Sequence, residues 1–374
     1  MSRDRTPRIL MTADAVGGVW QYALDLSAGL CRKGAQVVLA VLGPDPSPAQ
    51  KSAAEAAGVD LIATGLPLDW IAQDAAEVEA AGRAVAELAG RTGADIVHLN
   101  NPALAASADF AAPIVSICHS CVATWWRSVR GGALPEEFVW RTELVRRGYA
   151  ASALLLAPTK AFALATQETY GLSGPPRVVR NGRRPAQVEG SPTADPFVFT
   201  AGRLWDEGKN FSVLDRAAAR LSIPVIAAGA LEGPNGARVE ASHARVLGSV
   251  TDDEVARHLG LQPIFASAAL YEPFGLAVLE AAQAGCALVL SDIPTFRELW
   301  GEAAEFVPPD DPEAFAKVVE ELAGDEERRR RMGEAAKARS RAYSVDAMCA
   351  GVMTAYGDLL STGIARIRVE DAAA

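Results

Sequence analysis

Short apolar runs alternate with amphipathic stretches along most of the chain. Each run is rich in Val, Ile, Leu and Ala and is bounded by turn residues, which predicts a buried strand. In the first half these runs are Arg8–Met11, Gln36–Leu42, Val59–Ala63, Asp95–Leu99, Pro113–Cys118 and Ala153–Ala157. Between the first two, Gly18–Leu30 places apolar residues on one face of a helix, as packing on a sheet requires. This alternation predicts a doubly wound α/β domain.

The same pattern restarts in the second half. Its apolar runs are Pro196–Ala201, Ile223–Gly229, Arg245–Gly248, Pro263–Ser267 and Cys286–Ser291, followed by helical stretches at Pro312–Leu322, Glu326–Arg339 and Val345–Leu360. Between the halves, Gly171–Asp195 has the Pro, Gly and Ser content of a linker rather than of a core element. We therefore predict an N-terminal domain at residues 1–184 and a C-terminal domain at residues 185–342. The helix and tail at residues 343–374 are expected to return to the first domain.

Composition and charge narrow the class of protein. The chain has 374 residues, of which 50% are hydrophobic and 22% charged, so it is long enough for two cores and too apolar to be disordered. Its net charge of -10 argues against binding to nucleic acid, which depends mainly on Lys and Arg. The N-terminus shows no credible signal peptide and no long apolar run is free of charges, so we expect a soluble, cytoplasmic protein.

The cysteines suggest no disulfide framework. There are five, an odd number that fits unpaired thiols in a reducing compartment. Cys118 and Cys121 have CxxC spacing around His119, which leaves a redox or metal site as an alternative. No second Cys or His pair occurs at zinc spacing, so we expect no bound metal and no cofactor.

The segment Tyr271–Glu280, YEPFGLAVLE, is the most informative in the chain. Pro273 biases Glu272 away from helical dihedrals, so Glu272 stays in the loop and a helix is predicted to begin near Gly275. Free N–H groups at the start of that helix suit a diphosphate or the hydroxyls of a sugar. The donors are those of Gly275, Leu276 and Ala277.

Two carboxylates flank these donors. Glu280, further along the helix, can accept hydrogen bonds from vicinal hydroxyls such as those of a ribose. Glu272 is expected to face the part of the ligand that lies beyond the phosphates. A capped core helix with two solvated acids is the alternative, but the pair around EPFG favours a nucleotide-sugar site.

Other residues at the ends of predicted strands also suit a phosphate group. Gly17 and Gly18 follow the first strand, where backbone without a Cβ can approach a ligand closely. Arg203 and Lys209 follow the first strand of the second domain, and a diphosphate would satisfy both cations. A charged surface turn is the alternative, although ligands of open α/β sheets bind at this end of the strands.

These residues carry a family resemblance. The chain resembles a retaining glycosyltransferase of family 4, whose GT-B fold has two facing Rossmann-like domains. The resemblance runs through GGVWQYALDLSAGL, DIVHLN, HS at residues 119 and 120, AGRLWDEGKN, LGSVTDDEV and EPFGLAVLEAAQAGCALVLSD. The chain departs from the family at Ser120, which replaces an acidic or amide residue, and at Arg183–Arg184, where many members have Val-Asp.

The resemblance implies roles in the C-terminal domain. Arg203 and Lys209 would bind the donor diphosphate, and Glu280 would hold the ribose. Glu272, with the N–H groups of Gly275 to Ala277, would grip the sugar and the distal phosphate.

The resemblance also implies further donor contacts. Gly17 and Gly18 would close over the donor from the opposite domain. The segment from Gly248 to Val250 resembles one that contacts the base. His119 matches a histidine that touches the donor sugar near its reactive carbon; a satisfied histidine at a strand end is the alternative.

The implied reaction needs cations at the leaving group. Cleaving the bond between the anomeric carbon and phosphate leaves negative charge on the diphosphate, which Arg203 and Lys209 would stabilise. Family members of this kind need no divalent metal, and Asp252–Asp253 fits a helix N-cap better than a metal site. A retaining front-face reaction, in which the leaving phosphate helps to deprotonate the acceptor, would need no protein nucleophile.

The acceptor side is less specific. Tryptophans and arginines interleave in the first domain, and aromatic faces stack on sugars while arginines favour carboxylate or phosphate. The candidate acceptor residues are Trp125, Trp126, Arg127 and Arg130. They fit an acidic or phosphorylated acceptor, or docking at an anionic membrane that carries a lipid-linked sugar. A packed helix hairpin with ion pairs to Glu136, Glu137 and Glu143 is the alternative.

The sequence thus predicts transfer of a hexose from a nucleoside-diphosphate sugar to a sugar, lipid-linked or small-molecule acceptor. A UDP-sugar is favoured on family frequency alone. An epimerase of the same fold and a catalytically silent nucleotide-sugar-binding module are the alternatives. The pattern predicts no oligomeric state.

Overall fold

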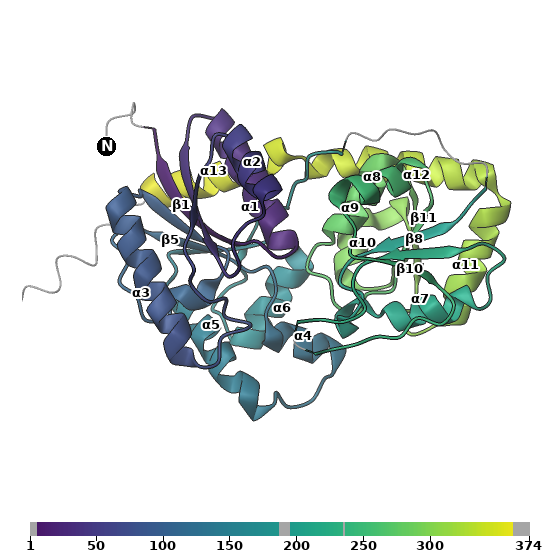
Figure 1. The fold of residues 1–374 in the computed structure, drawn as a ribbon, viewed down its shortest axis with the longest axis horizontal. Coiled ribbons are helices and arrows are strands. Elements are labelled where there is room, and N and C mark those ends of the chain that lie inside the picture. Colours follow the sequence, from purple (N-terminus) through teal and green to yellow (C-terminus); the bar gives the residue numbers. More distant parts are fainter. Residues whose placement is uncertain (1–5, 187–194, 235, 362–374) are drawn as a thin grey trace, which may run out of the picture. The chain divides into compact units, whose positions relative to one another are not determined.

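The computed structural model describes residues 6–186, 195–234 and 236–361, which form two compact units (Figure 1). The chain passes between the two units four times. Among the described residues, unit 1 comprises residues 6–126, 132–182 and 345–361, and unit 2 comprises residues 127–131, 183–186, 195–234 and 236–344.

Unit 1 contains a seven-stranded parallel sheet in the order β3-β2-β1-β4-β5-β6-β7. The strands are β1 (Arg8–Asp14), β2 (Gln36–Leu42), β3 (Asp60–Ala63), β4 (Ile96–Leu99), β5 (Ile114–Ile117), β6 (Leu154–Ala157) and β7 (Arg177–Val178). The helices are α1 (Gly18–Arg32), α2 (Pro48–Ala56), α3 (Ala75–Thr92), α5 (Val139–Ala151), α6 (Lys160–Tyr170) and α13 (Val345–Ser361), with short 3-10 helices η1 (Pro102–Ala105) and η2 (Glu136–Phe138). Helix α4 (Val122–Val129) begins in unit 1 and ends in unit 2.

Successive residues of the central strands enter two different cores of unit 1. In β1, Ile9 and Met11 belong to the core that includes α1 and α13, whereas Leu10 belongs to the core that includes α3. Side chains of a strand point alternately to opposite faces, so both faces of this sheet are covered. This arrangement explains why the strands read as continuous apolar runs rather than as alternating ones.

Unit 2 contains a six-stranded parallel sheet in the order β10-β9-β8-β11-β12-β13. The strands are β8 (Val198–Ala201), β9 (Val225–Ala228), β10 (Arg245–Gly248), β11 (Ile264–Ser267), β12 (Ala287–Ser291) and β13 (Glu305–Val307). The helices are α7 (Phe211–Ala218), α8 (Asp252–Gly260), α9 (Leu276–Ala284), α10 (Pro294–Trp300), α11 (Pro312–Gly324) and α12 (Glu326–Ser340), with 3-10 helices η3 (Glu207–Lys209), η4 (Gly301–Ala303) and η5 (Arg341–Tyr343). Apolar cores again lie on both faces of the sheet.

The predicted α/β fold class is confirmed, with two corrections in detail. Strand β7 lies inside Gly171–Asp195, which the sequence analysis treats as a linker without core elements, and β13 was not predicted. Both strands are too short to show a periodic pattern, and β13 begins with Glu305. Residues 187–194 of the predicted linker lie outside the described residues.

The C-terminal helix α13 is part of the core of unit 1. Met348, Val352 and Ala355 are at most 1% exposed and belong to the same apolar cluster as α1. The two helices approach closely at Gly29, where a Cβ would lie 2.1 Å from the Cys349 sulfur. Unit 1 therefore depends on a segment that follows unit 2 in the sequence.

A buried polar contact also ties α13 to the sheet. His98 of β4 is 0% exposed, and its Nδ1 lies 2.7 Å from the hydroxyl of Tyr356. Its Nε2 lies 3.5 Å from the hydroxyl of Tyr22 on α1. Burial lowers the pKa of His98 to about 3, so the ring is neutral in the folded protein at neutral pH.

This histidine is expected to make unit 1 sensitive to acid. Unfolding returns the pKa of His98 to roughly 6.5, so between pH 6.5 and 3 the unfolded state binds more protons and stability falls as pH falls. The expected loss from pH 7 to pH 5 is about 2 kcal/mol. Urea unfolding at both pH values should show a loss in His98→Gln that is smaller than the wild-type loss by this amount. The wild-type loss also includes the contribution of His119, whose pKa is lowered to about 3 by burial as well. Equal losses in the two proteins would contradict the assignment.

Candidate functional site

The loop that follows β8 is built to hold a fixed shape. The Asp206 carboxylate accepts a hydrogen bond from the Gly208 backbone N–H at 2.9 Å and so caps η3. Asn210 has a left-handed backbone, and its amide donates to the carbonyls of Ala268 and Pro309. The Gly208 carbonyl in turn accepts from the backbone N–H of Leu270. The loop after β8 is therefore tied to the loop after β11, which leads into YEPFG.

This connection brings two of the predicted site residues together. Lys209 Nζ donates to Glu272 Oε2 at 2.5 Å. The Lys209 side chain is 27% exposed and that of Glu272 is 14% exposed, so the pair is shielded while its ammonium stays accessible. The Arg203 side chain is 59% exposed and forms an ion pair with Asp206 at 3.3 Å.

Helix α9 begins where the sequence predicts it to begin. Gly275 is its N-cap with φ +90°, and in the described chain no side chain caps this end. Its backbone favours glycine, and an added Cβ would lie 3.1 Å from the Phe296 ring. The N–H groups of the first turn, including Leu276 and Ala277, lack intrahelical partners by the geometry of any α-helix. A helix start without a side-chain cap, a few residues after Glu272, suits an anionic or hydroxyl-rich ligand.

Glu280 has a partner that the sequence analysis missed. Arg183 Nε donates to Glu280 Oε1 at 2.7 Å, and the two side chains are 16% and 23% exposed. Arg183 also lies 3.7 Å from Asp252. The sequence marks Arg183 only as a departure from the family, since a pair 97 residues apart leaves no local signal. The carboxylate expected to hold the ribose is therefore already oriented by a guanidinium.

The aspartate pair at residues 252–253 is not the N-cap predicted for α8. Thr251 occupies that position and forms a capping box with Glu254, while the two aspartates lie in the first turn. A threonine hydroxyl accepts from the third helical N–H as well as a carboxylate does. The predicted N-cap was therefore wrong by one residue. That this aspartate pair does not bind a metal stays a prediction.

Glycines bring the ends of β8, β9 and β10 close together. The Gly229 N–H donates to the Gly248 carbonyl at 2.8 Å. A Cβ at Gly229 would lie 1.8 Å from the Gly202 carbonyl oxygen. Gly248 thus lies at the carboxyl edge of the sheet, and Val250 is partly buried against the neighbouring core. This is the edge at which open α/β sheets bind ligands.

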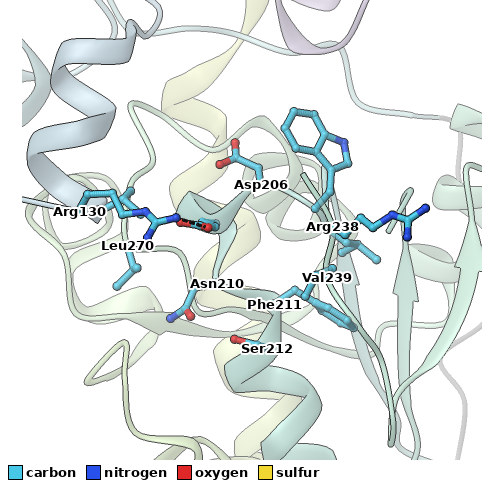
Figure 2. Close-up of a pocket in the computed structure, with 12 residues that line it drawn as sticks. Arg130, Asp206, Asn210, Phe211, Ser212, Arg238, Val239 and Leu270 are labelled. Atoms are coloured by element: carbon cyan, nitrogen blue, oxygen red, sulfur yellow. Dashed lines mark hydrogen bonds and ion pairs between the residues drawn. The ribbon is translucent and has the colours of Figure 1, made fainter. Parts of the chain in front are cut away.

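A pocket of about 280 Å³ opens beside η3 (Figure 2). Figure 2 shows Arg130, Asp206, Asn210 and Arg238 around it, and Arg130 forms an ion pair with Glu207 at 2.6 Å. All its lining residues belong to unit 2. The Lys209–Glu272 pair does not line this pocket.

The placement of Arg130 corrects one expectation. All the candidate acceptor residues were expected in the first domain. In the structure, residues 127–131, which include Arg127 and Arg130, belong to unit 2. The helical pattern of α4 runs across this division, so the sequence gives no sign of it.

In unit 1, His119 follows β5 and is held by polar and aromatic neighbours. Its Nε2 lies 2.7 Å from Asn100 Oδ1, and the Tyr22 ring stands edge-on at a centroid distance of 4.6 Å. Burial lowers the pKa of His119 to about 3. Gly17, with φ +87°, is the N-cap of α1, whose first residue is Gly18.

The tryptophans of α4 are partly buried. The Trp126 ring lies 6.0 Å from that of Phe138 and 6.3 Å from that of Trp125. The indole N–H of Trp126 is buried and has no hydrogen-bond partner among the described residues. An ion pair between Arg146 and Glu143 at 2.5 Å supports part of the helix-hairpin alternative. An acceptor role for this segment stays a prediction.

The cysteines form no disulfide in the described structure. Cys118 is buried, and Cys121 accepts a hydrogen bond from the Tyr170 hydroxyl at 3.0 Å. Within residues 6–186, 195–234 and 236–361, no group of His, Cys, Asp and Glu has the arrangement of a metal site. Over the same residues, no helix is both long and apolar enough to cross a membrane.

Two family models match adjacent parts of the chain. The model for glycosyl transferases group 1 matches residues 184–339, and the model for glycosyltransferase family 4 matches residues 16–187. A phosphatidyl-myo-inositol mannosyltransferase of Mycolicibacterium smegmatis is 31% identical over 136 residues, or 36% of this chain. The match spans 35% of that protein's length.

Solved structures share the fold at low sequence identity. Sucrose-phosphate synthase from Thermosynechococcus elongatus has a TM-score of 0.77 and 16% identity, over 96% of this chain and 100% of that one. Anabaena HepE in complex with UDP-glucose has a TM-score of 0.70 and 18% identity, over 94% and 99%. WaaG, a glycosyltransferase of lipopolysaccharide biosynthesis, has a TM-score of 0.69 and 16% identity, over 93% and 99%.

Proposed function

The chain belongs to the family 4 glycosyltransferases with a GT-B fold, and from this premise we propose that it transfers a hexose from a UDP-sugar. The observation that carries the proposal is the Lys209–Glu272 pair beside the start of α9. It places a cation, a carboxylate and helix N–H groups at one edge of the sheet. The complex of HepE with UDP-glucose supports the choice of donor.

The proposed reaction depends on charge at the leaving group. Lys209, with Arg203, stabilises the diphosphate as the bond to the anomeric carbon breaks, and the N–H groups of Leu276 and Ala277 add to this. Glu272 binds the sugar hydroxyls, and Glu280 binds the ribose while paired with Arg183. The leaving phosphate assists deprotonation of the acceptor on the same face of the sugar, so the configuration is retained without a metal ion or other cofactor.

The proposed acceptor is a hydroxyl on a sugar, a lipid-linked molecule or a small molecule. The partial match to a phosphatidyl-myo-inositol mannosyltransferase supports a phosphorylated, lipid-linked acceptor. Arg127 is exposed near the end of α4, and its guanidinium would suit such a phosphate or an anionic membrane surface. A cytoplasmic location, where nucleotide sugars are found, is part of the proposal.

Nucleotide release measured with and without acceptor tests the proposal. We expect slow release of UDP from a UDP-hexose alone and release at least about tenfold faster with an acceptor, because water replaces the acceptor poorly in an oriented site. Conversion of the sugar nucleotide without any acceptor would instead indicate an epimerase. Binding with no release under any condition would indicate a silent binding module, and either result would overturn the transferase proposal.

A further inference from the structure

Asn100, which follows β4, is held rigidly by the end of β1. Its backbone N–H donates to Thr12 Oγ1 at 3.0 Å, and its side-chain Nδ2 donates to the Thr12 carbonyl oxygen at 2.5 Å. Asn100 is 9% exposed and Thr12 is 1% exposed. One contact therefore holds the backbone of Asn100, and the other holds its side-chain amide.

The contact with the Thr12 carbonyl determines which amide atom of Asn100 lies next to His119. A backbone carbonyl only accepts hydrogen bonds, so the amide atom beside the Thr12 carbonyl must be the NH₂ group of Asn100. The other atom, Oδ1, then lies 2.7 Å from His119 Nε2. Because Oδ1 also only accepts, His119 Nε2 must carry the hydrogen.

The remaining ring nitrogen of His119 is then an acceptor. The titratable groups that face the ring are Tyr22 of α1, edge-on at 4.6 Å, and His98 of β4. Neither is charged near neutral pH, because burial raises the pKa of Tyr22 and lowers that of His98. Among the described residues, none forms a hydrogen bond with His119 Nδ1, and the side chain is partly exposed.

We propose that Asn100 is a positioning residue that holds His119 as the neutral Nε2–H tautomer, so that its Nδ1 accepts a hydrogen bond from a hydroxyl of a bound sugar. The second half of this statement rests on the proposed function; the first half does not. The unprotonated ring nitrogen of a neutral histidine can accept a hydrogen bond from a hydroxyl group and cannot bind a group that only accepts hydrogen bonds.

Nitrogen NMR of the full chain, labelled with ¹⁵N-histidine, tests the tautomer without any substrate. The His119 signals are identified by their loss in His119→Gln. We expect the wild type to show a protonated Nε2 and an unprotonated Nδ1 that do not titrate between pH 8 and 5. In Asn100→Asp a carboxylate faces the ring, which should raise the pKa of His119 and make the ring titrate in this range. Gln73→Glu adds the same charge at an exposed position of unit 1 and should leave the His119 signals unchanged.

An unprotonated Nε2 in the wild type, or an imidazolium at pH 7, would overturn the proposal. An equal response of the His119 signals to Asn100→Asp and to Gln73→Glu would also overturn it, since that would be a general effect of charge.

Kinetics test the role of Nδ1. Asn100→Asp should lower kcat at pH 7 about tenfold, the factor that one hydrogen bond contributes, with a smaller change in KM. The loss should shrink as pH rises and the ring loses its extra proton, whereas Gln73→Glu should give the wild-type pH profile. A pH-independent loss would show a structural effect and overturn the role of Nδ1. Absence of turnover in every protein would count against the proposed function, while the NMR result would still decide the tautomer.

Discussion

Lys209→Ala is expected to lower kcat/KM for the donor about 10²- to 10³-fold, the range observed when one preorganised group that stabilises transition-state charge is removed. Lys209 forms an ion pair with Glu272, three residues before the N-cap of α9, and its side chain is only 27% exposed. Its charge therefore acts with less screening from water than that of Arg203, which is 59% exposed. Initial rates of nucleotide release over a range of donor concentrations measure the effect.

Matched variants separate the role of the charge from the role of the ion pair. Lys209→Ala leaves the Glu272 carboxylate without this partner, whereas the double variant Lys209→Ala with Glu272→Gln removes that complication. Arg203→Ala is expected to cost less than Lys209→Ala, because Arg203 is more exposed. Activity of Lys209→Ala within about threefold of the wild type would contradict the assignment of Lys209 to the leaving group.

Val352→Asp is expected to prevent stable folding of unit 1. Val352 is 0% exposed and lies in the core that joins α13 to α1 and the sheet. An unpaired carboxylate at this position should cost more than about 4 kcal/mol, a large share of the roughly 5–15 kcal/mol that stabilises a typical domain. Urea unfolding and the yield of soluble protein measure the loss.

The neighbouring residue provides the control. Met353 is 38% exposed, so Met353→Asp introduces the same charge into the same helix and should change stability by less than about 1 kcal/mol. Similar losses in the two variants would mean that α13 is not packed in unit 1 as described. The comparison therefore tests the fold separately from the chemistry.

Much of the fold could be predicted because its signals are local. Strands buried on both faces produce apolar runs such as Gln36–Leu42, which the structure reproduces as β2 with the same bounds. The start of α9 at Gly275 follows from Pro273 and from the glycine itself, both within one turn of the helix. Strand β7 could not be predicted, because two residues are too few to show a periodic pattern of apolar positions.

The contacts between predicted site residues could not be read from the sequence. Spacing along the chain gave Lys209 and Glu272 as separate candidates, and only the backbone hydrogen bond from Leu270 to Gly208 brings their loops together. Arg183 carried no motif, so its pairing with Glu280 depends on how the chain enters unit 2. Asn100 is the last residue of DIVHLN, but its contact with His119 depends on neighbouring strands of the sheet.

Calorimetric titration with UDP, GDP and ADP, with and without magnesium, tests the central claim most directly. The wild type is expected to bind one of the three, UDP by our proposal, with an affinity that magnesium does not change. In Lys209→Ala that affinity should fall by about tenfold or more, as expected for the loss of a hydrogen bond between charged groups. No binding of any nucleotide by the wild type, or equal binding by the variant, would contradict a nucleotide-sugar site built around Lys209.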